Sequence, residues 1–193
     1  MALGLFPGDA EMIAQQRRPA TKSTMASVLD AQLTALESQF VPAAEAMPAD
    51  KYSFAPTMGG YNGVRTFALE VKHVATANFI FYSAILGQAL PTGVNLAGAT
   101  NGPDDIQTKD QILRFLKDSF ALGHKAFATL TPQNATIPLT KSPVPLMNTR
   151  LALATWGCAH AWDHYGQMVE YLRLNGIIPP ASKGQPRANA SGE

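Results

Sequence analysis

The sequence is poor in cysteine and in charge, and both shortages exclude classes of protein. A single cysteine, Cys158, among 193 residues leaves no intrachain disulfide to form. Charged residues make up only 15% of the chain and nearly cancel, with 15 basic and 14 acidic side chains. This balance gives no electrostatic reason to expect nucleic acid as a partner. Hydrophobic residues reach 46%, so most of the chain is expected to fold.

Long apolar runs are also missing. None approaches the roughly 20 residues that a membrane span needs, so we expect no membrane insertion. The apolar start, residues 1–7, is short and lacks a basic segment, which is unlike a signal peptide. We therefore expect a cytoplasmic protein. Export with a leader that was trimmed from the native product stays open as the alternative.

What the chain does have is helical periodicity. Apolar residues recur at three- and four-residue steps over residues 24–47, 63–90, 104–131 and 149–174. Asp104 and Asp105 are placed to begin the third helix, at the positive end of its dipole. Residues 135–139 form the only strand-like piece. The pattern predicts an all-α fold, a four-helix bundle. The loops 91–102 and 131–148 are longer than an up-down bundle needs, which predicts crossover-type connections.

The predicted bundle, residues 23–178, lies between an N-terminal arm, residues 1–22, and a flexible C-terminal tail, residues 179–193. Long apolar helices with little charge are expected to leave apolar surface after the bundle closes, which predicts a homodimer. In the alternative, the arm covers this surface within one chain. The apolar residues of the arm are Leu3, Leu5, Phe6, Met12 and Ile13.

Three histidines carry the functional prediction. His160 and His164 are four residues apart and therefore lie on one helix face. His73 lies on an apolar stripe of the second predicted helix, so only the fold could bring it to the pair. Three neutral imidazoles can hold one metal ion and leave positions open for water or substrate, as in catalytic sites. The alternative is three ordinary histidines satisfied inside a bundle. Imidazole suits zinc, nickel, copper and iron alike.

Neighbouring residues have predicted roles as well. Asp163 lies about 60° from the histidine stripe and is expected to accept a hydrogen bond from an imidazole. Gly157 leaves room for a facing helix or a ligand. Cys158, about 200° around the helix from His160, is predicted to be buried and to be no ligand. His124 is expected at the edge of the core or in a pocket.

Five segments support a family resemblance. They are residues 48–56, 64–67, 70–78, 160–167 and 171–180. The third and fourth, Glu-Val-Lys-His-Val-Ala-Thr-Ala-Asn and His-Ala-Trp-Asp-His-Tyr-Gly-Gln, contain the three histidines. In order and spacing the segments resemble the DinB-like family of metal-binding, four-helix bacterial proteins. The resemblance implies that His73, His160 and His164 bind one divalent metal, zinc or nickel.

The resemblance also implies a reaction type. Characterised relatives transfer low-molecular-weight thiols, and one isomerises maleylpyruvate with the help of such a thiol. We therefore expect a metal-dependent enzyme of the thiol S-transferase or hydrolase type that acts on a small-molecule substrate. Tyr82, Gln167 or Tyr171 is expected to contact the substrate. The alternative is a non-catalytic, stress-related protein that binds a metal or a ligand. The sequence identifies no catalytic residue.

Overall fold

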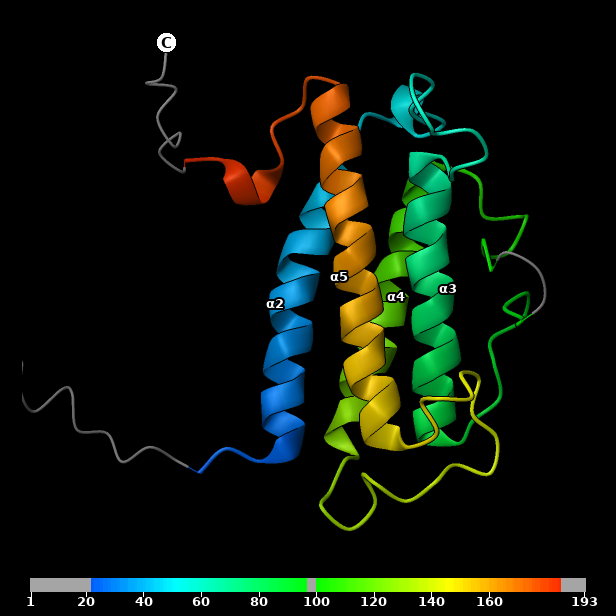
Figure 1. Cartoon of the computed structure of the whole chain (residues 1–193), viewed down its shortest axis with the longest axis vertical. Coiled ribbons are helices and arrows are strands. Elements are labelled where there is room, and N and C mark those ends of the chain that lie inside the picture. The colour runs from blue at the N-terminus through cyan, green and yellow to red at the C-terminus, as the bar shows by residue number, and fades with distance from the viewer. Residues whose placement is uncertain (1–21, 97–99, 185–193) are drawn as a thin grey trace, which may run out of the picture.

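The structure, a computed structural model, describes residues 22–96 and 100–184 (Figure 1). Four long helices account for most of it: α2 (Met25–Ala46), α3 (Phe67–Leu86), α4 (Lys109–Ala128) and α5 (Arg150–Leu174). Two short 3-10 helices, η1 (Ala49–Lys51) and η2 (Pro180–Ser182), flank them. Within the described residues, strand-like pairing is limited to an isolated antiparallel bridge between Pro138 and Thr149. The predicted all-α class is confirmed.

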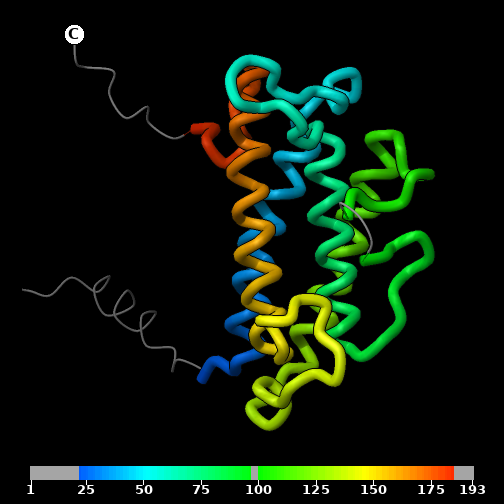
Figure 2. The backbone as a smooth tube through the Cα atoms, turned by 45° about the vertical axis from the view of Figure 1, so that its right-hand side comes forward, coloured from blue at the N-terminus to red at the C-terminus, as the bar shows by residue number. Residues whose placement is uncertain are grey.

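The helices form a bundle in which successive helices do not all alternate in direction. α3 packs against α4 and α5, and α2 packs against the same two helices, so α2 and α3 lie on a diagonal. α2 and α5 run in one direction and α3 and α4 in the other (Figure 1). The connection from α3 to α4 returns along the outside of the bundle (Figure 2). This is the crossover-type loop that the sequence predicts, and it is needed because two successive helices run parallel.

Two helices begin later than predicted, and the same two end earlier, at Leu86 and Ala128. α3 begins at Phe67 rather than near residue 63, because the Thr66 side chain caps the helix and accepts a hydrogen bond from the Leu69 amide. α4 begins at Lys109, where Thr108 and Gln111 form a capping box. Asp104 and Asp105 lie in a turn ahead of α4, so the prediction that they begin this helix is wrong.

The core is continuous through the bundle and includes Tyr82. This side chain is fully buried. A Cβ atom added at Gly123 of α4 would lie 2.7 Å from the Tyr82 ring, and one added at Gly157 of α5 would lie 3.2 Å from its hydroxyl. The two glycines thus make room for the ring between the helices. Tyr82 is a packing residue in the core. Whether it also contacts a substrate stays a prediction.

The predicted arm and tail lie largely beyond the described part of the chain. Of the N-terminal arm only residue 22 is described, so the arm's predicted apolar residues fall outside it. Residues 180–182 of the predicted flexible tail form η2, while residues 185–193 fall outside the described residues. Among the described helices, none combines the length and the apolar character that a membrane crossing requires.

Candidate metal centre

The three histidines meet between α3 and α5. His73 projects from α3, and His160 and His164 project from successive turns of α5. Their ligand atoms all lie within 4.8 Å of one another. The Nε2 atoms of His73 and His160 are 3.1 Å apart. Two nitrogens bound to one zinc ion in a tetrahedral site lie roughly 3.3 Å apart, so this spacing fits a shared metal. The fold therefore brings His73 to the pair, as the sequence predicts.

A buried carboxylate orients one of the imidazoles. Glu70, one turn before His73 on α3, is only 2% exposed. Its Oε2 atom lies 2.6 Å from His164 Nδ1. When His164 is neutral, Nδ1–H donates to this carboxylate, and the lone pair stays on Nε2. A carboxylate behind an imidazole is the usual outer partner of a metal-binding histidine, because it fixes both the tautomer and the ring orientation.

A residue of the crossover loop does the same for His73. The Nδ1 atom of His73 lies 3.2 Å from the carbonyl oxygen of Thr100 and 2.9 Å from its hydroxyl oxygen. With Nδ1 protonated, the imidazole donates to the loop and leaves the Nε2 lone pair facing the other histidines. Thr100 adopts a φ of 52°, a left-handed conformation that is uncommon for a residue other than glycine. The loop is therefore held in a particular shape where it meets the cluster.

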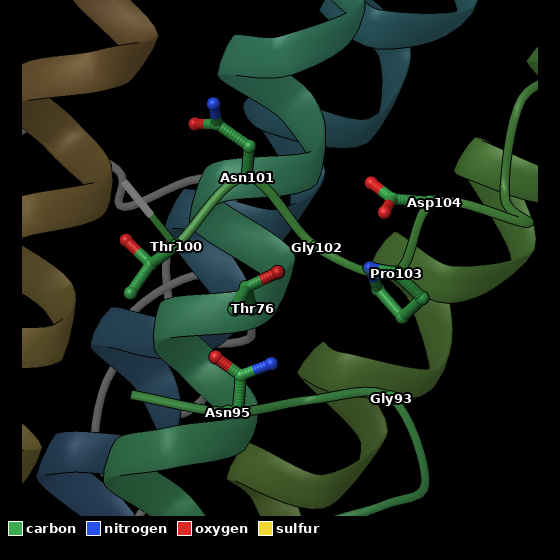
Figure 3. A pocket seen from close by; sticks show the side chains of 8 residues that line it. All are labelled: Thr76, Gly93, Asn95, Thr100, Asn101, Gly102, Pro103 and Asp104. Carbon is green, nitrogen blue, oxygen red and sulfur yellow. The ribbon is translucent and has the colours of Figure 1, made fainter. Parts of the chain in front are cut away.

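Further contacts attach this loop to α3 (Figure 3). The Lys72 ammonium donates a hydrogen bond of 2.8 Å to the carbonyl oxygen of Pro103. Gly102 lies against α3 so closely that an added Cβ atom would be 3.0 Å from the Thr76 hydroxyl oxygen. A polar cavity of about 260 Å³ lies beside this contact and is lined by residues that include Thr76 and Asn95. The loop is thus fixed to the helix that carries His73.

The environment keeps two of the imidazoles uncharged. Burial, followed by the positive charge of Arg65 and the proximity of His164, lowers the pKa of His73 to about 4. Burial, the neighbouring histidines and Arg65 lower the pKa of His160 to about 3. Near neutral pH both rings are therefore neutral, which is the form that binds metals. The Nδ1 atom of His160 is buried and meets no hydrogen-bond partner in residues 22–96 and 100–184.

The predicted role of Asp163 is wrong. Its carboxylate is on the exposed side of α5 and accepts a hydrogen bond of 3.0 Å from Gln167 Nε2. Glu70 takes the place that the sequence assigned to Asp163. Gln167 is exposed and lines a cavity next to Glu70, so its predicted place near the site agrees with the structure. Whether it contacts a substrate stays a prediction.

Tyr171 and Cys158 are both buried. The hydroxyl of Tyr171 donates a hydrogen bond of 3.0 Å to the carbonyl oxygen of Arg65, so Tyr171 positions the segment ahead of α3. Its contact with a substrate stays a prediction. Burial of Cys158 is confirmed, and this burial raises the pKa of its thiol to about 11.

His124 lies between α4 and α2, whereas the three-histidine cluster lies between α3 and α5. It projects from α4 toward α2, where its Nδ1 atom is 2.6 Å from Asp30 and its Nε2 atom is 2.9 Å from Glu37. The side chain is 31% exposed. The prediction of a core-edge position agrees with this placement. Both ring nitrogens are engaged by carboxylates of α2, so His124 links two helices rather than lining the cluster.

Sequence reasoning missed three residues of the site. Glu70 could have been found, because a carboxylate three positions before His73 falls near the same helix face. Thr100 and Arg65 gave no such signal. They lie in connections between helices, and only the packing of the loop and of the segment before α3 brings them to the histidines.

The fold and the site together define a four-helix protein with three clustered histidines compatible with metal binding. The sequence profile of the DinB superfamily matches residues 32–168, and the chain belongs to this superfamily. A crystal structure of a conserved protein from Enterococcus faecalis shares the fold, with a TM-score of 0.61 at 15% sequence identity. That match covers 79% of this chain and 98% of the other. No curated protein matches the chain.

Proposed function

We propose that the protein binds one divalent metal, zinc or nickel, through His73, His160 and His164, and acts as a metal-dependent enzyme. The convergence of one ligand nitrogen from each histidine within 4.8 Å supports the proposal most directly. The residues fit a metal because the Nδ1 atoms of His164 and His73 are already bonded, to Glu70 and to Thr100 respectively. Nε2 is thus the ligand atom that each of these two rings presents.

The proposed reaction type is thiol S-transfer or hydrolysis. A divalent metal held by neutral histidines supplies a Lewis acid that lowers the pKa of a bound water or thiol. In this proposal Glu70 and Thr100 hold two imidazoles in place. Three protein ligands leave positions for a low-molecular-weight thiol or a small-molecule substrate. The proposed reaction class rests on the family resemblance of the sequence, and the proposed metal site is supported by the geometry of the three histidines.

Two measurements test the proposal. Elemental analysis of full-length protein purified without added metal is expected to give about one zinc or nickel ion per chain. The loaded protein is then assayed with bacterial thiols plus electrophiles, and separately with esters and amides. Turnover that disappears in His160→Ala supports the enzyme. Metal-dependent ligand binding without turnover would instead favour a non-catalytic, stress-related binding protein. Purified protein that takes up none of these metals would contradict both.

We also propose that the protein forms a homodimer. Val28 on α2 and the two tryptophans of the adjacent α5, Trp156 and Trp162, are large apolar side chains at 46%, 38% and 37% exposure. Such residues are candidates for an interface. Light scattering on the full chain and on a shortened chain that begins at Thr21 is expected to give a dimer in both cases. A monomeric full chain that dimerises only after shortening would show that the arm covers this surface instead.

A further inference from the structure

A second cavity lies beside the histidine cluster. It has a volume of about 360 Å³, and its polar lining consists of Arg65, Glu70, Asn101 and Gln167. Two of these residues connect it to the cluster: Glu70 is bonded to His164, and Asn101 follows Thr100, which contacts His73. A cavity of this size accommodates a small molecule. A ligand held at the histidines would therefore have this cavity next to it.

Arg65 gives the cavity a positive charge. Its Nε atom donates a hydrogen bond of 2.8 Å to Asn101 Oδ1, which orients the guanidinium. Its backbone carbonyl is held by Tyr171 from α5. The residue is half-buried, so water screens its charge less than that of a fully exposed side chain. A planar guanidinium in a fixed orientation is well suited to recognising a carboxylate.

The charges around the cluster favour an anion. Three neutral imidazoles leave both positive charges of a divalent metal in place. Among the described residues that line the cavity, Glu70 carries a carboxylate and is engaged by His164. Asp163, bonded to the lining residue Gln167, is exposed. The positive charge of Arg65 offsets the negative charge of Glu70, so the charge of the metal remains. A metal-loaded site therefore keeps a positive field, which attracts a negatively charged ligand.

We propose that this cavity binds a carboxylate group of the small molecule that the metal centre takes, with Arg65 as the recognition residue. The ligand class is thus a small molecule with a metal-binding group, such as a thiol, at one end and a carboxylate at the other. The inference depends on the proposed metal site but not on a particular reaction.

The test compares two thiols that differ in one group. 3-Mercaptopropionate and 3-mercapto-1-propanol have the same length, and only the first carries a carboxylate. Full-length protein loaded with Co²⁺ reports thiolate binding through sulfur-to-cobalt charge-transfer absorption, and the thiol proton goes to the solvent. Because a carboxylate also has affinity for the metal itself, the readout is the change in the ratio of the two dissociation constants on mutation.

Arg65→Gln is expected to lower the preference for 3-mercaptopropionate about tenfold, the typical effect of losing a charged hydrogen-bond donor. Binding of 3-mercapto-1-propanol should not change. Arg150→Gln is the matched control: Arg150 is also half-buried and its Nε atom also donates to a fixed oxygen, the Ile85 carbonyl at 3.1 Å. It lies at the start of α5, roughly 15 Å along the helix from His160, and should leave the ratio unchanged.

An unchanged ratio in Arg65→Gln, with cobalt and both thiols bound, would overturn this inference alone. Wild-type protein that binds no cobalt would overturn the metal site, and this inference with it. If Arg65→Gln releases cobalt, Arg65→Lys takes its place, since it keeps the charge but loses the two-pronged geometry. It should keep cobalt and lose part of the preference, and an unchanged ratio there would count against Arg65.

Discussion

The three-histidine cluster and the single His124 lie between different helix pairs of the bundle, in opposite electrostatic environments. His73, His160 and His164 meet between α3 and α5, where burial lowers the pKa of the first two. His124 lies between α4 and α2 with a carboxylate on each ring nitrogen. Burial acts to lower the pKa of His124 as well, but hydrogen bonds and charges of Asp30 and Glu37 outweigh it, and the pKa is raised.

The difference shows what makes a histidine a candidate metal ligand. A neutral imidazole donates from one nitrogen only. His124 has acceptors at both nitrogens, so the doubly protonated cation satisfies the site best, and this form cannot bind a metal. In the three-histidine cluster, His164 and His73 each have an acceptor at Nδ1, and Nε2 of His73 faces Nε2 of His160. Partners on one side of the ring leave the other side for a metal.

The strongest test of this comparison removes a ligand. His160→Ala and His164→Ala are each expected to reduce bound metal from about one ion per chain to near none, because two ligands rarely hold a metal that three held. Elemental analysis after gel filtration measures the loss. His124→Ala is the control and should keep its metal. Full occupancy in the double variant His73→Ala, His160→Ala would show that the metal lies elsewhere.

A smaller effect on metal binding is expected from Glu70, which contacts the proposed ligand His164. Glu70→Gln keeps the size of the side chain but removes the charge that supports His164. Loss of such a partner typically weakens metal binding about 10- to 100-fold. Competition with a chromophoric chelator gives the affinity. Glu37→Gln is the control: it removes a carboxylate that contacts His124 and should leave the metal affinity unchanged. Equal metal affinities for the two variants would mean that Glu70 has only a packing role.

The ion pairs of His124 with Asp30 and Glu37 should stabilise the fold by about 1 kcal/mol, the range of partly exposed ion pairs. Because the pKa is raised in the folded state, this contribution is fully present below the ordinary value of 6.5 and is lost as pH rises through the folded pKa. His124→Gln should therefore lower the unfolding free energy more at about pH 5.5 than at about pH 9.

Urea unfolding of both proteins in the presence of a chelator measures this difference without a metal contribution. Asp30→Asn should reduce the same pH dependence, since it removes one of the two carboxylates. A destabilisation by His124→Gln that grows with pH would contradict the ion-pair interpretation.

The smallest effect on the metal is expected at Cys158. It is two residues from His160 but buried in the core, so Cys158→Ser should leave metal content and any activity unchanged. Burying a hydroxyl there should cost about 1–3 kcal/mol of stability. Elemental analysis and circular dichroism together provide the measurement. Loss of metal with the fold intact would mean that Cys158 belongs to the cluster.

The sequence by itself determined what lies within one helix. The periodicity predicted four helices, the spacing of His160 and His164 placed them on one face, and the angle of Cys158 predicted its burial. These properties follow from the helical repeat, which sets the direction of every side chain relative to its neighbours in the chain. The length of the loop 91–102 also predicted a crossover connection. For the longer loop 131–148 this prediction is wrong, because the loop joins α4 and α5, which run in opposite directions, at one end of the bundle (Figure 1).

Only the tertiary structure decided which residues of different segments meet. Glu70 rather than Asp163 contacts an imidazole because α3, and not the outer side of α5, faces His164. Thr100 reaches His73 because the loop between α3 and α4 returns along the bundle. Tyr82 lies in the core because glycines on α4 and α5 admit its ring. Such contacts join positions far apart in sequence, so they depend on how helices and loops pack, which no local repeat encodes.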